Sequence, residues 1–269
     1  MTSKVGAGLR SGGYRTLRGI FLIFLVLYWV NLLVPLIGPF SHTRRLWLIS
    51  SVIIGLLSLV VLCKAGVPDK SKVLLGLFLA LLAGLRQPFT GIITLLAWLA
   101  SMRMMETTEE RVFILKRSFG KSLLLGVSLG LVLGVVNLFL GGLPLKFAPT
   151  VDALVLAFNP GVAEEVIFRL FVYAFSLNLL GGRVVTRKET IWLYVLMVVP
   201  HVLLHFPDNY FVDGILTLDL GVLFIGPLLA GLLFGLPMTL AMVKRDLTSA
   251  MLIHTIVDYL RFIFIGLPF

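Results

Sequence analysis

Residues 160–180 read PGVAEEVIFRLFVYAFSLNLL, an almost wholly apolar stretch that contains two adjacent acids, Glu164 and Glu165, and one base, Arg169. At about 1.5 Å per residue, a helix of this length spans roughly 30 Å, which is enough to cross a membrane. A charged side chain at the centre of a bilayer costs about 2.5 to 3.5 kcal/mol on insertion scales. Two acids and a base so close together therefore indicate a buried functional site.

The composition of the whole chain supports a membrane location. Of its 269 residues, 59% are hydrophobic and 13% are charged, and the mean hydropathy is +1.05. Soluble domains carry about 25% charged residues, so this chain lacks the polar surface that a soluble fold needs. The sequence predicts an all-α, polytopic bundle of transmembrane helices, and we expect an integral, multi-pass protein of the cell membrane.

We expect about eight spans. Seven follow from apolar runs of roughly the length that a crossing requires: residues 19–37, 46–63, 122–143, 160–180, 190–205, 220–243 and 247–266. Residues 73–102 are interrupted by Arg86, Gln87 and Pro88, so they form either one broken span or a tight helical hairpin. The total is therefore eight or nine.

The chain has a formal net charge of +10, and its basic residues lie beside the predicted spans. Such an excess can attract polyanions, but here the basic residues flank apolar runs, which is typical of loops next to anionic lipid. We therefore expect membrane lipids as partners and no nucleic acid. The positive-inside rule predicts a cytoplasmic face from one group of residues, Arg183, Arg187, Lys188, Lys244 and Arg245, and an external loop from another, Asp208, Asp213 and Asp219.

The start of the helix that carries the glutamates is indicated by two adjacent residues. Asn159 is a favourable N-cap, and Pro160 suits the first turn because it has no amide hydrogen to leave unpaired. The pattern predicts a helix that begins near Pro160, with residues 151–158 as a separate or kinked entering piece. Glu164 and Glu165 then lie in the second turn.

Helical spacing predicts different partners for the two glutamates. Glu165 and Arg169 are four residues apart and can pair along one helix face. Glu164 points about 100° away and has no partner on its own helix. An unpaired carboxylate in a low-dielectric cavity is suited to general-base chemistry. The alternative interpretation is that Glu164, Glu165 and Arg169 form one structural ion cluster that holds helices together.

Three of the four histidines follow this helix in sequence. His201 and His205 are four residues apart, as are His254 and Asp258, so each pair can share a helix face. Asp258 can orient the His254 imidazole or hold it protonated, although Arg261 can compete for that carboxylate. Two histidines and a glutamate could also bind zinc, but residues 201–205 read HVLLH and lack the glutamate of the HExxH motif. We therefore expect no metal and no other cofactor.

Together these segments resemble a known family. Residues 164–169, EEVIFR, resemble the EExxxR motif of the CAAX protease and bacteriocin-processing family (CPBP or Abi), which includes the Ras-converting CAAX endopeptidases. Residues 201–205 and 254–258 are similar to its second and third motifs, in the same order. The resemblance covers residues 151–269 as a catalytic membrane region, preceded by a basic, cytoplasm-like segment, 1–18, and by N-terminal membrane spans, 19–150.

The resemblance implies a metal-independent, glutamate-type intramembrane protease. Glu164 would act with His205 to activate a water that attacks the scissile carbonyl, while Glu165 would hold Arg169. His254 and Asp258 would occupy the positions of the oxyanion hole. The expected substrate is a peptide or a lipidated protein, either a prenylated CAAX protein or a leader or bacteriocin-like peptide, cut near the membrane surface.

Two positions depart from the family pattern. His201 stands where an aromatic residue is usual, and it could tune or duplicate His205 or cap the span. Asp258 stands where asparagine is common, and an ionised aspartate only accepts hydrogen bonds. We expect Asp258 to keep His254 charged, so that the imidazolium is the donor. The alternatives are a catalytically silent scaffold or regulator of the same fold, and a proton-coupled transporter with Glu164 as the relay.

Overall fold

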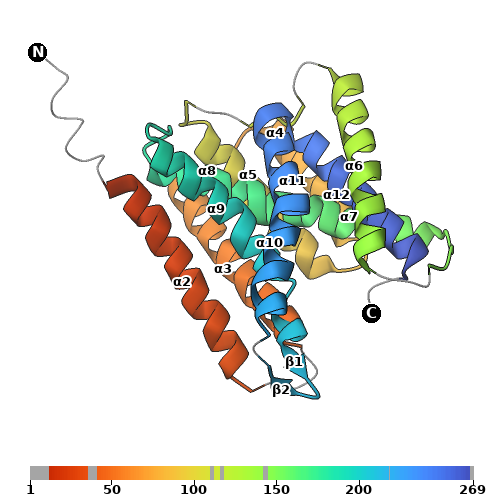
Figure 1. The fold of residues 1–269 in the computed structure, drawn as a ribbon. Coiled ribbons are helices and arrows are strands. Elements are labelled where there is room, and N and C mark those ends of the chain that lie inside the picture. Colours follow the sequence, from red (N-terminus) through yellow and green to blue (C-terminus); the bar gives the residue numbers. More distant parts are fainter. Residues whose placement is uncertain are drawn as a thin grey trace, which may run out of the picture.

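The computed structural model describes residues 12–35, 41–109, 112–115, 118–141, 145–217 and 219–266. These residues form a bundle of helices, and the strands among them are two short ones joined in a hairpin (Figure 1). The all-α class is therefore confirmed. Residues 1–11 of the predicted basic segment lie outside the described residues, and residues 13–18 belong to the first described helix.

The N-terminal half contributes five described helices, α2 (Gly13–Leu33), α3 (His42–Ala65), α4 (Lys70–Gly84), α5 (Pro88–Met105) and α6 (Phe119–Gly141). In the C-terminal half, α7 (Val151–Glu164), a π-helical turn (Glu165–Leu170) and α8 (Phe171–Leu179) follow one another directly, and α9 (Arg187–Leu203) comes next. A 3₁₀ turn (Pro207–Tyr210) leads into the hairpin of β1 (Phe211–Val212) and β2 (Ile215–Leu216).

The last two long helices close the bundle. Residues Gly221–Arg245 form one helix in which α10 (Gly226–Ala230) and α11 (Leu236–Leu240) alternate with π-helical turns, and α12 (Leu247–Phe264) follows. Six described helices are long and apolar enough to cross a membrane by length and composition: α2, α3, α5, α6, Gly221–Arg245 and α12. The protein is therefore a multi-pass membrane protein, while the count of eight or nine spans stays a prediction.

Residues 73–102 form a hairpin of two helices, which was one of the two alternatives. Helices α4 and α5 approach so closely that a Cβ atom added to Gly91 would lie 2.7 Å from the carbonyl oxygen of Ala80. The indole nitrogen of Trp98 donates a hydrogen bond to the carbonyl of Lys72 at 2.8 Å. Small residues and one interhelical hydrogen bond thus hold this hairpin together.

The helix that carries the glutamates begins earlier than its sequence suggests. Thr150 is the N-cap, since its hydroxyl accepts from the amide of Ala153 at 3.0 Å, and α7 continues through Pro160. The expectation of a helix start near Pro160 is therefore wrong. Asn159 does not cap the helix, because its side-chain amide donates to the carbonyl of Ala83 on α4 at 2.5 Å.

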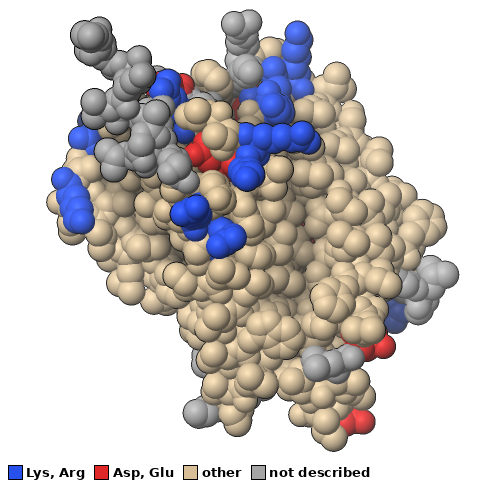
Figure 2. Space-filling view, turned by 60° about the vertical axis from the view of Figure 1, so that its left-hand side comes forward, with Lys and Arg blue, Asp and Glu red and all other residues tan. Residues whose placement is uncertain are grey.

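Charge is distributed unevenly over the surface. On the face shown in Figure 2, Lys and Arg side chains gather at one end of the molecule, and a broad uncharged belt lies below them. This is the end at which α2 and α9 begin and the Gly221–Arg245 helix finishes, while the β1–β2 hairpin lies at the other end (Figure 1). The basic residues predicted to share a cytoplasmic face thus lie at one end, and the orientation in the membrane stays a prediction.

The crossing of α7 and α12 is the packing feature that positions the site. A Cβ atom added to Gly161 would lie 2.9 Å from the backbone nitrogen and Cα of Thr255. Real Cβ atoms do not approach backbone atoms so closely, hence any side chain here must push the helices apart. Glu164 follows Gly161 by one helical turn, so its position depends on this contact.

We expect Gly161→Ala to destabilise the protein by about 1 to 3 kcal/mol, as overpacking does in well-packed cores. The measurement is the thermal unfolding midpoint of the purified protein in detergent. Gly19→Ala is the control, because Gly19 lies inside α2 and a Cβ atom there would meet nothing within 4 Å. Equal midpoints for the two variants would contradict the role of the crossing.

Candidate active site

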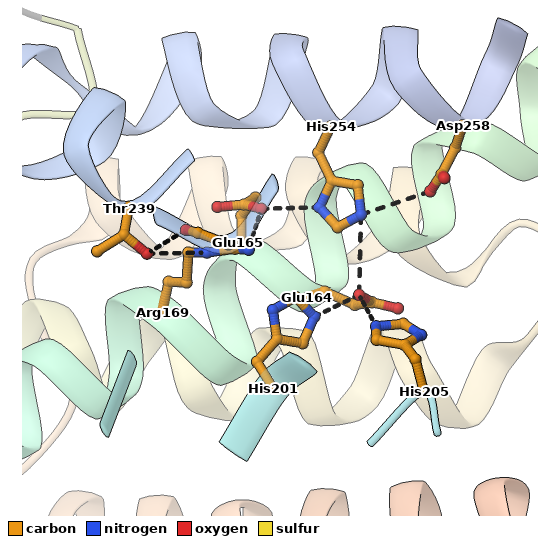
Figure 3. Close-up of polar contacts among 9 residues, drawn as sticks. Glu164, Glu165, Arg169, His201, His205, Thr239, His254 and Asp258 are labelled. Atoms are coloured by element: carbon orange, nitrogen blue, oxygen red, sulfur yellow. Dashed lines mark hydrogen bonds and ion pairs between the residues drawn. The ribbon is translucent and has the colours of Figure 1, made fainter. Parts of the chain in front are cut away.

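Three separate segments bring the predicted site residues together (Figure 3). Glu164 ends α7 and Glu165 opens the π-helical turn. His201 lies in the last turn of α9, and His205 lies in the turn after that helix. His254 and Asp258 lie one turn apart on α12. The sequence motifs are thus distant in the chain and adjacent in space.

A π-helical turn, Glu165–Leu170, begins at the second of the two acids and directly follows the first. All six of its residues are buried. A π turn holds one more residue than an α turn does, and such turns occur frequently at functional sites. It widens the helix directly after Glu164, at the point where α12 and the end of α9 converge.

Glu165 and Arg169 form a buried ion pair, as their spacing predicted. Their side chains are 0% and 1% exposed, so both charges depend on protein partners instead of water. The Nε of Arg169 also donates to the hydroxyl of Thr239 on α11 at 3.3 Å (Figure 3). Among the described residues, no ion pair joins Glu164 to Arg169, so the two acids have different partners.

Glu164 faces three histidines through one oxygen atom. Its Oε2 lies 2.5 Å from Nε2 of His201, 3.6 Å from Nε2 of His205 and 3.8 Å from Nε2 of His254. The nearest imidazole is therefore His201, although the family resemblance implied His205 as the partner. Glu164 is 8% exposed, so few partners other than these rings can reach it.

His201 and His205 differ in their surroundings. The ring of His201 is buried and stacked on Phe168, with centroids 5.5 Å apart, and its Nδ1 has no hydrogen-bond partner among the described residues. We therefore assign its single N–H to Nε2, where it donates to Glu164. The His205 side chain is 51% exposed, and its ring meets that of His201 edge-on at 5.3 Å.

His254 is held between carboxylates. Its Nδ1 donates to Oε1 of Glu165 at 2.7 Å, a contact that the sequence did not suggest. Its Nε2 faces Asp258 at 3.4 Å and Glu164 at 3.8 Å. Among the described residues, Arg261 forms no ion pair with Asp258 within 4.0 Å, although its positive charge still acts on that carboxylate. Glu165 thus fixes the ring so that Nε2 points at the other two acids.

A cavity of about 250 Å³ opens beside these groups. We call it the histidine cavity, because its lining includes His201, His205 and His254. Asp258 and Arg169 also line it, together with Arg261, which the sequence suggested only as a competitor for Asp258, and Asn137, which sequence reasoning did not place in the site. A sequence signal for Asn137 did exist, since it is a lone amide in an apolar span. Thr239 gave no signal, because a threonine in a membrane helix is unremarkable.

Glu164, His201 and His205 also fit the ligand count of a metal site. One ligand atom from each lies within 4.8 Å of the other two. A histidine bound to zinc almost always donates its second N–H to an acceptor, and Nδ1 of His201 has none among the described residues. Nε2 of His201 already bonds directly to Glu164, so an ion could enter only if that bond broke. His201 thus lacks the hydrogen bond to a further acceptor that usually orients a histidine bound to zinc.

A second, apolar cavity of about 190 Å³ lies behind the first. It is enclosed by α2, α3, α8 and α9, and its lining includes both Phe168 and His201. Other lining residues, Ile23 and Ile53, are 71% and 42% exposed, so the cavity reaches the outer surface of the bundle. His201 therefore borders both cavities.

Comparison with known proteins gives one family match. Residues 146–260 match the model of the family described as Rce1-like, type II CAAX prenyl endopeptidase. The matched stretch includes the glutamates, the three histidines and Asp258. No curated protein and no solved structure matches the chain. Over residues 146–260, the chain is therefore similar to the Rce1-like family of type II CAAX prenyl endopeptidases.

Proposed function

We propose that this protein is an intramembrane endopeptidase that hydrolyses a peptide bond with water activated by Glu164, without a metal ion. The supporting observation is the approach of three imidazoles to one carboxylate oxygen of a nearly buried glutamate. A general base must lie within hydrogen-bond reach of the proton that it removes, either directly or through one water. The separation of 3.6 Å between Glu164 and His205 is compatible with a water held by both.

In this mechanism the carboxylate of Glu164 accepts a proton from the water, and the water oxygen attacks the scissile carbonyl carbon. His205, which is exposed to the histidine cavity, holds the water, takes the proton over from Glu164 and delivers it to the leaving nitrogen. His201 positions Glu164 through its 2.5 Å hydrogen bond and does not touch the substrate. The products are a new carboxylate and a new amine.

His254 stabilises the oxyanion in the same mechanism. In its protonated form the ring donates Nδ1–H to Glu165 and carries a second N–H on Nε2, which lies at the cavity between Asp258 and Glu164 and can donate to an oxyanion that develops there. Asp258 supports the charged ring as an acceptor. The ionised Asp258 is itself no oxyanion donor.

The substrate that we favour is a lipidated peptide. The apolar cavity behind His201 reaches the outer surface of the bundle, where an isoprenoid or acyl chain can enter from the bilayer. Burial of each CH₂ group there contributes about 0.8 kcal/mol to binding. An unmodified leader peptide would leave this cavity without a role.

We expect Glu164→Gln to lower peptide cleavage by at least about 100-fold, because the amide cannot accept a proton from water. The measurement is turnover of fluorogenic prenylated and unmodified peptides by purified protein in detergent. Glu109→Gln is a matched control, since Glu109 is an exposed glutamate at a loop and pairs with Arg183 at 3.5 Å. If a peptide library is left intact by the wild type while Glu164→Gln abolishes transport or binding of a partner, the protease proposal fails.

Chelators separate the metal-free mechanism from a zinc mechanism. We expect cleavage to be unchanged by EDTA and by 1,10-phenanthroline, because Glu164 and His205 activate water directly in the proposed mechanism. His201→Phe should also remain active within about tenfold, since a phenyl ring can still stack on Phe168. Loss of activity on chelation that added Zn²⁺ reverses, together with loss of activity in His201→Phe, would identify Glu164, His201 and His205 as metal ligands instead.

His254 and Asp258 have different expected sensitivities. His254→Ala removes the oxyanion donor and should lower kcat by about 10²- to 10³-fold. Asp258→Asn should retain turnover or raise it, because the 2.7 Å contact with Glu165 still orients His254 and the new amide can donate to the oxyanion. The measurement is kcat on one peptide for both variants, and complete loss in Asp258→Asn would show that its charge is required.

A further inference from the structure

The position of His205 is set by the chain on either side of it. Helix α9 ends at Leu203, and the backbone amide of His205 donates to the carbonyl of Val202 at 3.1 Å in the turn that follows. The side chain is 51% exposed, and Oε2 of Glu164 lies 3.6 Å from its Nε2. That separation is too long for a direct hydrogen bond, so Glu164 does not hold the ring in place.

The turn after His205 is anchored to the N-terminal half of the chain by a buried pair of tyrosines. Tyr210, at the end of the 3₁₀ turn, is 1% exposed, and Tyr28 on α2 is 2% exposed. The hydroxyl of Tyr28 donates to that of Tyr210 at 3.1 Å. A buried hydroxyl that loses its partner costs free energy, so this bond favours one position of the turn.

A second anchor joins the same turn to the start of α3. The amide of Thr43 donates to Oδ1 of Asp208 at 3.3 Å, and the amide of Asp208 donates to the hydroxyl of Thr43 at 3.2 Å. The carboxylate lies at the N-terminal end of α3, where the helix dipole favours a negative charge. One residue beyond the tyrosine, Phe211 stacks on His42 with ring centroids 4.1 Å apart. The turn is thus held by both α2 and α3.

The segment between His205 and these anchors is short and internally bonded. The amide of Asn209 donates to the carbonyl of Phe206 at 2.9 Å, and the amide of Thr217 donates to the carbonyl of Tyr210 at 2.7 Å. Pro207 has a fixed φ angle, which removes one more freedom from the turn. A shift of the anchors is therefore passed on to His205 instead of being absorbed.

We infer that Thr43 and Tyr28 are positioning residues for His205, which they hold at the distance from Glu164 that one water can bridge. Neither Thr43 nor Tyr28 lines the histidine cavity, so neither touches a substrate there. This inference rests on the proposed role of His205 in proton transfer. It gives a part in catalysis to the N-terminal half of the chain, which lies outside the matched stretch 146–260.

The test is a double-mutant cycle on kcat, with purified full-length protein in detergent and one prenylated fluorogenic peptide. We expect Thr43→Val to lower kcat by at least about tenfold with KM within about twofold, since a displacement of about 1 Å can cost about 100-fold. His205→Ala should lower kcat by about 10²- to 10⁴-fold. Adding Thr43→Val to His205→Ala should cause no further loss, because the threonine acts only through the ring.

Tyr28→Phe should behave as Thr43→Val does, and Thr43→Ser, which keeps the hydroxyl, should restore kcat. Two matched controls lie at the start of α2, Thr16→Val and Tyr14→Phe. The hydroxyl of Thr16 donates to the carbonyl of Gly12 one turn back, and that of Tyr14 accepts from Arg15, so neither reaches the turn after His205. Both controls should keep the wild-type kcat. Thermal unfolding midpoints show that each variant is folded at the assay temperature.

The outcomes separate this inference from the protease proposal. A variant that keeps the wild-type kcat removes the role assigned to its residue, and if Thr43→Val and Tyr28→Phe both do so, the inference is overturned while the protease proposal stands. An equal proportional loss with and without His205 also overturns it, because the anchors would then act on the fold as a whole. If His205→Ala itself keeps the wild-type kcat, the proposed role of His205 fails, and spectroscopy decides whether the anchors position the ring.

NMR reads the position of the ring without any cleavage. The chain has four histidines, so protein labelled with ¹³C at histidine Cε1 gives four imidazole signals, and His205→Ala identifies the one from His205. We expect Thr43→Val and Tyr28→Phe to shift or broaden this signal and Thr16→Val to leave it in place. An unmoved His205 signal in both anchor variants would overturn the inference, whatever the cleavage assays show.

Discussion

The buried ion pair between Glu165 and Arg169 is the interaction on which the rest of the site depends. Both charges lie where water cannot reach them, so each must be satisfied by protein groups. Arg169 bonds to Glu165 and Thr239, and Glu165 also accepts from His254. One pair therefore ties the π-helical turn to α11 and α12. Breaking such a pair by removing one partner costs about 3 to 5 kcal/mol, hence the scaffold around Glu164 is strongly constrained.

The sequence predicted those features that depend on local spacing. The all-α class follows from apolar length and low charge, and the Glu165–Arg169 pair follows from the four-residue period of a helix. For residues 73–102 the sequence could not decide between one broken span and the hairpin of α4 and α5. The residues at 86–88 are equally consistent with a break in a long helix and with a tight turn. The helix start at Thr150 was missed because Asn159 has a tertiary partner, the carbonyl of Ala83, that competes with capping.

Contacts between helices were less predictable. Motif spacing predicted one shared helix face for His201 and His205, but His205 lies in the turn after α9. Spacing also cannot tell which ring is buried against Phe168 and lies nearest to Glu164. The hydrogen bond from His254 to Glu165 depends on how closely α12 crosses α7 at Gly161, and no local pattern encodes that crossing. The catalytic roles of these residues, and the division of the chain at residues 18 and 150, stay predictions.

The ring of His201 lines both cavities, and it stacks on Phe168, which lines the apolar one. On one side of the His201 ring the histidine cavity holds polar groups, and on the other side the apolar cavity reaches the outer surface of the bundle. Glu164 bonds directly to this ring. The carboxylate therefore sits at a dielectric boundary one side chain thick, and the energy of its charge varies with whether lipid, water or a substrate chain fills the space behind His201.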